Sequence, residues 1–177
     1  DGFSYSFGPD VNAASTSPSA EVGTGTKLTV SFSNYGSNSR GIRIYYNPAS
    51  NQSLTTTVGS VMLAYSSNLN WMGTRSKVAI NVDNSGKLTL TLNGSVIFNN
   101  VQLPADYLTS NKATWKHVFK ARTGAVNDLM AIDNLAILHG YGPTDHTIIA
   151  RDYEIDQVIT TANINTYELP TIETQNV

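Results

Sequence analysis

The chain has no cysteine, little charge and no long hydrophobic run, and each shortage excludes a class of protein or site. Without cysteine, its 177 residues form neither disulfides nor thiolate metal sites. No stretch approaches the ~20 apolar residues that a membrane-spanning helix needs, so we expect no membrane span. Only 14% of the residues are charged and the net charge is −2, which does not favour nucleic acid as a partner.

The composition that remains favours a β-rich domain. Hydrophobic residues make up 40% of the chain, and 177 residues are enough for one domain with a substantial core. Low charge and abundant Ser, Thr, Asn and Gly are more typical of an all-β extracellular module than of a helical cytosolic enzyme. We therefore expect a secreted or surface-displayed protein.

The clearest secondary-structure pattern lies mid-chain. Apolar residues alternate with polar or small ones over 78–83 and again over 88–93, a period of two that is typical of half-buried strands. The sequence Asp83-Asn84-Ser85-Gly86 supplies a turn between them, and Asn93-Gly94 supplies a second turn before a third strand. We predict a meander of three antiparallel strands whose apolar face needs a cover.

Alternation elsewhere predicts strands at 1–7, 27–35, 41–46, 58–65, 114–121 and 129–138, and residues 103–108 could form one helical turn. No stretch has a strong helical period, so we expect no helix longer than ~7 residues. Short strands with regularly spaced turns indicate an all-β sandwich or barrel.

The last part of the chain differs in pattern. Residues 147–150, 154–160 and 164–169 are β-prone, with Pro143 before them and Pro170 after them, whereas 171–177 resemble a linker or a free tail. We predict a sandwich over residues 1–138 and a C-terminal extension over 139–177.

Several segments, in their order along the chain, resemble the concanavalin A-like group that includes legume lectins. They are DGFSYSFGP at 1–9, LTVSFSNY at 28–35, GIRI at 41–44, the hairpin at 83–86, VFKARTG at 118–124 and IDNLAI at 132–137. The resemblance covers residues 1–138. It implies a jelly roll of two antiparallel sheets, with loops at one rim forming a glycan site.

The resemblance implies a sugar-binding role for Asp1, because a carboxylate is a double acceptor that suits vicinal hydroxyls. The alternative is a strand-start Asp with no ligand. The turn at 122–128 corresponds to the specificity loop, which adds Gly124, Asn127 and Asp128 to the candidate site. Asn127 and Asp128 could also bind a Ca²⁺ ion, or could instead cap their own turn.

The positions that correspond to the metal-bearing strand of legume lectins are Ser31 and Ser33, and neither is a carboxylate. Ca²⁺ requires several hard oxygen ligands with enough negative charge among them. We therefore expect the double metal site of legume lectins to be lost, which removes the brace that orders their sugar loop. Any Ca²⁺ should bind at Asn127 and Asp128.

Exposed aromatic rings offer a second route to sugar binding, because a ring face stacks on the C–H face of a pyranose. Trp71, in a polar loop, is the strongest candidate, and three tyrosines are weaker ones: Tyr35, Tyr45 and Tyr65. Trp115 alternates with other apolar residues and is expected in the core.

Catalysis is not expected. Glycosidases need two carboxylates across the scissile bond. The nearest approach to the Glu-x-Asp-x-x-Glu pattern of related glucanases is Glu154-Ile-Asp156-Gln-Val-Ile159, which lacks the third acid. The three histidines have no partners at a catalytic or metal-binding spacing.

These observations predict a non-catalytic module that binds a glycan or a cell-surface polysaccharide in adhesion. The alternative is a structural subunit of a surface layer, sheath or filament that uses a lectin-like fold with strand exchange. Asn51 and Asn93 begin N-glycosylation patterns, which also arise by chance in an Asn- and Ser-rich chain.

The ends of the chain suggest self-association. The chain opens directly in a strand pattern, so we expect that preceding residues were removed by processing or lie outside this piece. The strand that would pair with the closing strand is then missing, which leaves a sheet edge exposed. We expect the β-prone segment 147–169 to fill this edge, in its own subunit or in a neighbour.

Overall fold

The computed structural model describes residues 2–14, 20–36, 39–49, 52–123, 130–138, 146–149 and 159–162. The chain forms two units, Asp1–Met130 and Ala131–Val177. The described residues of unit 1 form only strands and loops apart from one short helix. Its elements are β1 (Gly2–Gly8), β2 (Leu28–Ser33), β3 (Gly41–Tyr46), β4 (Met62–Ser66), β5 (Val78–Val82), β6 (Lys87–Leu92), β7 (Ser95–Gln102), α1 (Ala105–Thr109) and β8 (Lys116–Arg122).

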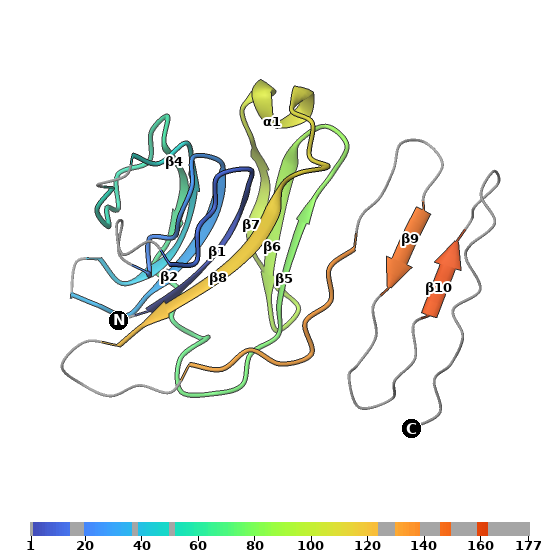
Figure 1. Ribbon diagram of the computed structural model, residues 1–177. Helices are drawn as coiled ribbons and strands as arrows, with labels where there is room; N and C mark the ends of the chain where they lie inside the picture. Colours follow the sequence, from blue (N-terminus) through green and yellow to red (C-terminus); the bar gives the residue numbers. More distant parts are fainter. Residues whose placement is uncertain are drawn as a thin grey trace. The chain divides into compact units, whose positions relative to one another are not determined.

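Five strands of unit 1 form an antiparallel sheet in the order β4-β3-β2-β1-β8 (Figure 1). The last strand of the unit, β8, therefore pairs with the first, β1, with Tyr5 opposite Phe119. Strand β1 pairs on its other side with β2, where Phe3 lies opposite Phe32. Strands from both ends of the unit thus lie side by side at one end of the sheet order.

A second antiparallel sheet, β5-β6-β7, packs against one face of the first in a sandwich-like arrangement. The core between them is apolar and comes from alternate residues of the strands, as their period of two requires. Leu88 and Leu90 of β6 are fully buried against Val30 of β2 and Ile44 of β3, among other residues of one cluster. Trp115, Tyr107 and Phe7 close this core near α1.

The opposite face of the five-stranded sheet is also buried, although it carries small polar side chains. Ser4 donates a hydrogen bond to the carbonyl of Ala20 at 2.5 Å, and Ser31 donates one to the carbonyl of Glu21. The backbone N–H of Thr24 donates to Ser6 at 3.0 Å. Serines leave room for a covering segment and satisfy its backbone polar groups, which must be paired when they leave water.

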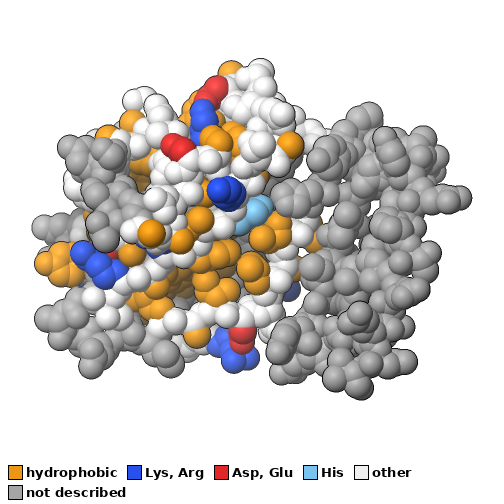
Figure 2. All heavy atoms as spheres, viewed as in Figure 1, with side chains coloured by type: hydrophobic (Ala, Val, Ile, Leu, Met, Phe, Trp, Pro, Cys, Tyr) orange, Lys and Arg blue, Asp and Glu red, His pale blue; other side chains and the backbone are white. Residues whose placement is uncertain are grey.

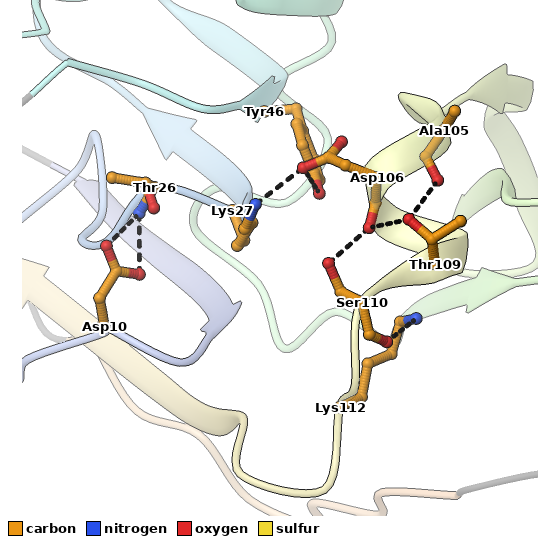
Figure 3. Close-up of polar contacts among 9 residues, drawn as sticks. All are labelled: Asp10, Thr26, Lys27, Tyr46, Ala105, Asp106, Thr109, Ser110 and Lys112. Carbon is orange, nitrogen blue, oxygen red and sulfur yellow. Dashed lines mark hydrogen bonds and ion pairs between the residues drawn. The ribbon is translucent and has the colours of Figure 1, made fainter.

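Helix α1 is held at one end of the sheet by the Asp106 carboxylate (Figure 3). Oδ2 of Asp106 accepts hydrogen bonds from Lys27 Nζ at 2.7 Å and from the Tyr46 hydroxyl at 3.0 Å. The hydrogen bond from Lys27 and that from Tyr46 lower the pKa of Asp106, while burial raises the pKa of Tyr46. We name this end of unit 1 the Asp106 end.

Most predicted strands of unit 1 are confirmed within a few residues, as is the helical turn before β8. The strand predicted at 129–138 is wrong in the part that the structure describes, because residues 130–138 form no strand. Ile132, Leu135 and Leu138 are each more than half exposed there. Alternating apolar residues do not make a strand unless a neighbouring strand pairs with the backbone.

Unit 2 contains one described pair of antiparallel strands, β9 (His146–Ile149) and β10 (Ile159–Ala162). Strand β9 confirms most of the β-prone segment predicted at 147–150. Strand β10 overlaps only the end of the segment predicted at 154–160. The third predicted segment, 164–169, lies outside the described residues.

Candidate functional site

The strand registers of unit 1 bring Trp71 and several polar residues to one end of the sandwich. Gly2 pairs with both Ser33 and Arg122, and Ser33 pairs with Gly41. Strand β4 ends at the same level, with Ser66 opposite Ile42. The loops β2–β3 and β4–β5 therefore meet here with the end of β8, and we name this the Trp71 end.

Trp71 lies in the β4–β5 loop and packs edge-on against two aromatic rings of the sheet. Its ring centroid is 5.5 Å from that of Phe3 and 5.6 Å from that of Phe32, with interplanar angles of 86° and 78°. Phe3 and Phe32 stack on each other at 4.4 Å. Trp71 is half-buried, so the sandwich fixes its indole ring at this end instead of leaving it free in a loop.

Trp71 and Asn34 each have a buried polar atom at this end without a hydrogen-bond partner among the described residues. These atoms are Nε1 of Trp71, which is a donor, and Oδ1 of Asn34, which is an acceptor. Asn34 directly follows β2 and is two residues from Phe32, which contacts Trp71. A buried polar group without a partner costs about 1–3 kcal/mol, so two at one end are a notable feature.

The β2–β3 loop is held by its own hydrogen bonds and presents an aromatic ring to solvent. Arg40 Nε donates to the carbonyl of Asn34 at 3.1 Å, and Ser39 donates to the carbonyl of Tyr35 at 2.5 Å. The Tyr65 hydroxyl donates to the carbonyl of Arg40 at 2.8 Å. Tyr35, one of the aromatic residues predicted to stack on a sugar, is 61% exposed on this loop.

An ion pair lies at the same end. The Glu21 carboxylate is 2.5 Å from Arg122, with the Glu21 side chain almost fully buried and that of Arg122 half-exposed. Glu21, which lies in the segment that covers the outer face of the sheet, thus pairs with Arg122, the last residue of β8. A partly exposed arginine beside a buried acid keeps this end ordered while leaving part of the guanidinium in contact with solvent.

Other candidate aromatics have different surroundings. Tyr45 is fully buried, so the prediction of an exposed ring there is wrong. It lies on the face of β3 that residues 52–57 cover, and burial raises the pKa of its hydroxyl. Tyr65 is partly buried, with its ring 5.0 Å from the Arg43 guanidinium. The predicted core position of Trp115 is confirmed, since only 9% of it is exposed.

Arg43 is the largest fully buried residue of the sheet, and the pattern of residues around it did not indicate its burial. Its Nε donates to the carbonyl of Thr55 at 2.5 Å, and its terminal nitrogens donate to the carbonyls of Gly41 and Ser39. No acidic side chain in the described part of the chain forms an ion pair with it. Burial lowers the pKa of Arg43. The hydrogen bonds of its guanidinium connect β3 with the loops that contain Thr55 and Ser39.

Tyr5 and His117 form a second polar contact that sequence reasoning missed. The Tyr5 hydroxyl lies 2.9 Å from Nδ1 of His117, across the β1–β8 pair. Burial raises the pKa of Tyr5. Only the alternation of His117 with Trp115 and Phe119 indicated that this histidine faces the aromatic layer, where its ring stacks on Phe7 at 4.4 Å.

The remaining predicted site residues, Asp1, Gly124, Asn127 and Asp128, lie outside the described residues. Their glycan and Ca²⁺ roles stay predictions. No group of three or more His, Asp or Glu side chains suited to a metal ion occurs within the described ranges. Ser31 and Ser33 are both fully buried in β2.

Comparison of the chain with models of known protein families, with curated proteins and with solved structures found no match. None of the helices in the described ranges has the length and apolar character needed to cross a membrane.

Proposed function

We propose that this protein is a non-catalytic, secreted or surface-displayed module that binds a glycan at the Trp71 end of unit 1. The observation that carries the proposal is the pair of buried, unpartnered polar atoms, Trp71 Nε1 and Asn34 Oδ1. One is a donor and the other an acceptor. A sugar hydroxyl both donates and accepts hydrogen bonds, so hydroxyls of one glycan suit both atoms, which are shielded from solvent in this structure and become accessible when the glycan displaces neighbouring side chains.

The aromatic surroundings support this assignment. Trp71 is held edge-on by Phe3 and Phe32, so its orientation is fixed before any ligand binds. Tyr35 adds an exposed ring on the neighbouring loop. Rigid aromatic rings beside a few convergent polar groups form the usual lining of a ligand site, and they lose little entropy on binding.

The resemblance to concanavalin A-like proteins leads to the same end of the molecule. The residues that correspond to the rim loops of that group are Asp1 and the turn at 122–128, and Gly2 and Arg122 are paired at the Trp71 end. We propose a jelly roll of the same general type. Asn127 and Asp128 of that turn are the proposed ligands of any bound Ca²⁺.

A binding screen with matched variants tests this function. The full chain is applied to an array of neutral and acidic polysaccharides, followed by titration of each positive glycan. Trp71→Phe and Asn34→Ala should each weaken binding about tenfold, which corresponds to one lost hydrogen bond of about 1.4 kcal/mol. Leu108→Ala, an exposed residue at the Asp106 end, is the control and should bind as the parent does. Binding to no glycan, or equal binding by all variants, contradicts the proposal.

A second candidate is a structural subunit that assembles through its sheet edges, and one observation favours it. Val78, Ile80 and Val82 of β5 are only half-buried, and no described strand pairs with the outer edge of β5. Tyr5 and Phe119 of the facing sheet are also only half-buried. Figure 2 shows hydrophobic side chains gathering on the viewed face of the molecule. An edge without a described partner strand, beside partly exposed apolar side chains, is a template for strand addition.

The register of β5 defines a test of this candidate. The N–H of Asn93 donates to the carbonyl of Lys77, so alternate residues of β5 from Lys77 face β6, and Ile80 faces the outer edge. Ile80→Pro should therefore abolish assembly while leaving the hairpin paired. Sedimentation velocity of the full chain tests this. A monomeric parent, or a folded Ile80→Pro variant with unchanged assembly, contradicts the structural role.

A further inference from the structure

The charges of the chain divide unevenly between its two units. Residues 1–130 contain ten Lys and Arg and six Asp and Glu, whereas residues 131–177 contain one Arg and seven Asp and Glu. The formal charges of these stretches are therefore +4 and −6, which together give the −2 of the whole chain. Unit 1 is thus basic, although the chain as a whole is acidic.

Several cations of unit 1 lie at the Trp71 end. Arg40 directly precedes β3, Lys77 directly precedes β5, and Arg122 ends β8. All three are exposed. Lys77 belongs to this end because the adjacent Ser76 donates a hydrogen bond to the carbonyl of Asn70, in the same loop as Trp71. The only described acid of unit 1 at this end is Glu21, which is buried and paired with Arg122.

The Asp106 end differs, because the other described acids of unit 1 lie there. Lys27 pairs with Asp106, and the Asp10 carboxylate accepts two hydrogen bonds from the backbone N–H of Thr26 (Figure 3). Asp83 accepts hydrogen bonds within its own turn. Among the described residues, the Asp106 end thus carries three acids, whereas the Trp71 end carries one, Glu21, beside Arg40, Lys77 and Arg122.

One contact connects this charge directly to the proposed site. Arg40 Nε donates to the carbonyl of Asn34 at 3.1 Å, so its guanidinium lies beside the residue whose Oδ1 has no partner. A guanidinium presents its N–H groups in a planar fork that matches carboxylate and sulfate oxygens. A neutral sugar makes no use of such a charge.

We propose that the glycan bound at the Trp71 end is an acidic polysaccharide that carries carboxylate or sulfate groups, which extends the function proposed above and rests on it. Trp71 and Asn34 bind the sugar hydroxyls, and Arg40, Lys77 and Arg122 attract its acidic groups. Electrostatic attraction of this kind accelerates association and weakens as salt screens it.

Matched polymers separate charge from sugar recognition. Highly methyl-esterified pectin is compared with the same pectin after de-esterification, and dextran is compared with carboxymethyl dextran and dextran sulfate. The full chain should bind at least one acidic polymer about tenfold more tightly than its neutral counterpart. This preference should shrink when salt rises from about 50 to about 500 mM. The carboxylate and sulfate polymers show which acidic group is preferred.

Charge-removing variants locate the effect. Arg40→Gln combined with Lys77→Gln should reduce affinity for the preferred acidic polymer about tenfold, and should leave affinity for any neutral glycan unchanged. Lys116→Gln, an exposed lysine at the start of β8 at the Asp106 end, is the control and should have no effect. An effect of Lys116→Gln equal to that of either rim substitution would show non-specific attraction and overturn the proposal.

The outcomes also separate the two proposals. Binding to a neutral glycan with no preference for its acidic counterpart overturns the acidic class and retains the glycan function. Absence of binding to every polymer in these pairs and in the array overturns the glycan function, and the acidic class with it. Acidic preference that survives the Arg40→Gln and Lys77→Gln substitutions overturns the assigned residues.

Discussion

The indole ring of Trp71 lies edge-on to the phenyl ring of Phe3, with centroids 5.5 Å apart and planes at 86°. Edge-to-face aromatic pairs contribute about 0.5–1.5 kcal/mol beyond the area that they bury. Trp71 makes a similar contact with Phe32. These contacts anchor a loop residue to the end of the core, while Nε1 of the same ring has no described partner.

Because the Trp71 ring packs on the core while its N–H has no described partner, two substitutions of Trp71 should have different effects. Trp71→Ala should lower the free energy of unfolding by about 3 kcal/mol, because it removes a large ring from the edge of the core. Trp71→Phe should change it by less than about 1 kcal/mol, since it keeps aromatic contacts and removes an unsatisfied donor. Urea denaturation of both variants measures this. Equal destabilisation would show that the N–H has an essential structural partner.

Arg43 should be a structural residue despite its charge. Arg43→Met should lower the free energy of unfolding by about 2 kcal/mol, because it leaves the carbonyls of Thr55, Gly41 and Ser39 without their donor. Limited proteolysis should then cleave within 52–57 faster than in the parent. The control is Arg40→Met, an exposed arginine, which should change stability by about 0.5 kcal/mol or less. If both substitutions have equal effects, Arg43 does not hold the loop.

The lowered pKa of Asp106 predicts a pH-dependent contribution to stability. Because the pKa is lower in the folded than in the unfolded protein, the contribution is present above the unfolded value of about 3.9 and is lost as pH falls through the folded value. The side chain is about half-exposed, so we expect only about 0.5 kcal/mol. Asp106→Asn should thus be less stable than the parent at pH 7, and the difference should vanish near pH 2. Thermal unfolding at both values tests this, and a difference that persists at the lower pH would contradict it.

Glu21 and Arg122 should be coupled energetically. Arg122→Met leaves a buried carboxylate without this partner, and should destabilise the protein more at pH 7 than Glu21→Gln combined with Arg122→Met. A double-mutant cycle should give a coupling of about 1–2 kcal/mol, because one partner is half-exposed. Additive effects of the two single substitutions would show that the pair contributes no net stability.

The sequence predicted the strands of unit 1 well because their apolar residues alternate strictly and their turns contain Asn and Gly. The same pattern failed at 130–138, because a strand also needs a neighbour that local sequence does not reveal. Arg43 and Tyr45 occupy the polar face of an alternating strand, so sequence alone placed them toward solvent. Their burial depends on a loop that crosses the outer face of the sheet.

The candidate site was predictable only in part. Trp71 was predicted as a site residue because it is a tryptophan in a polar loop, but its contacts with Phe3 and Phe32 involve residues far away in sequence. Asn34 gave no signal among many asparagines, because only the fold shows that its Oδ1 is buried without a described partner. The charge imbalance between the units is visible in the sequence, yet its meaning depends on where the registers bring Arg40, Lys77 and Arg122.

The most direct test of the glycan site observes Nε1 of Trp71 itself. The chain has two tryptophans, so a ¹H–¹⁵N correlation spectrum contains two indole signals, which Trp115→Phe assigns. During titration with a glycan that binds, the Trp71 indole signal should shift in proportion to occupancy, while that of Trp115, buried near the Asp106 end, should not move. A bound glycan that leaves the Trp71 indole signal unchanged would contradict the proposed site.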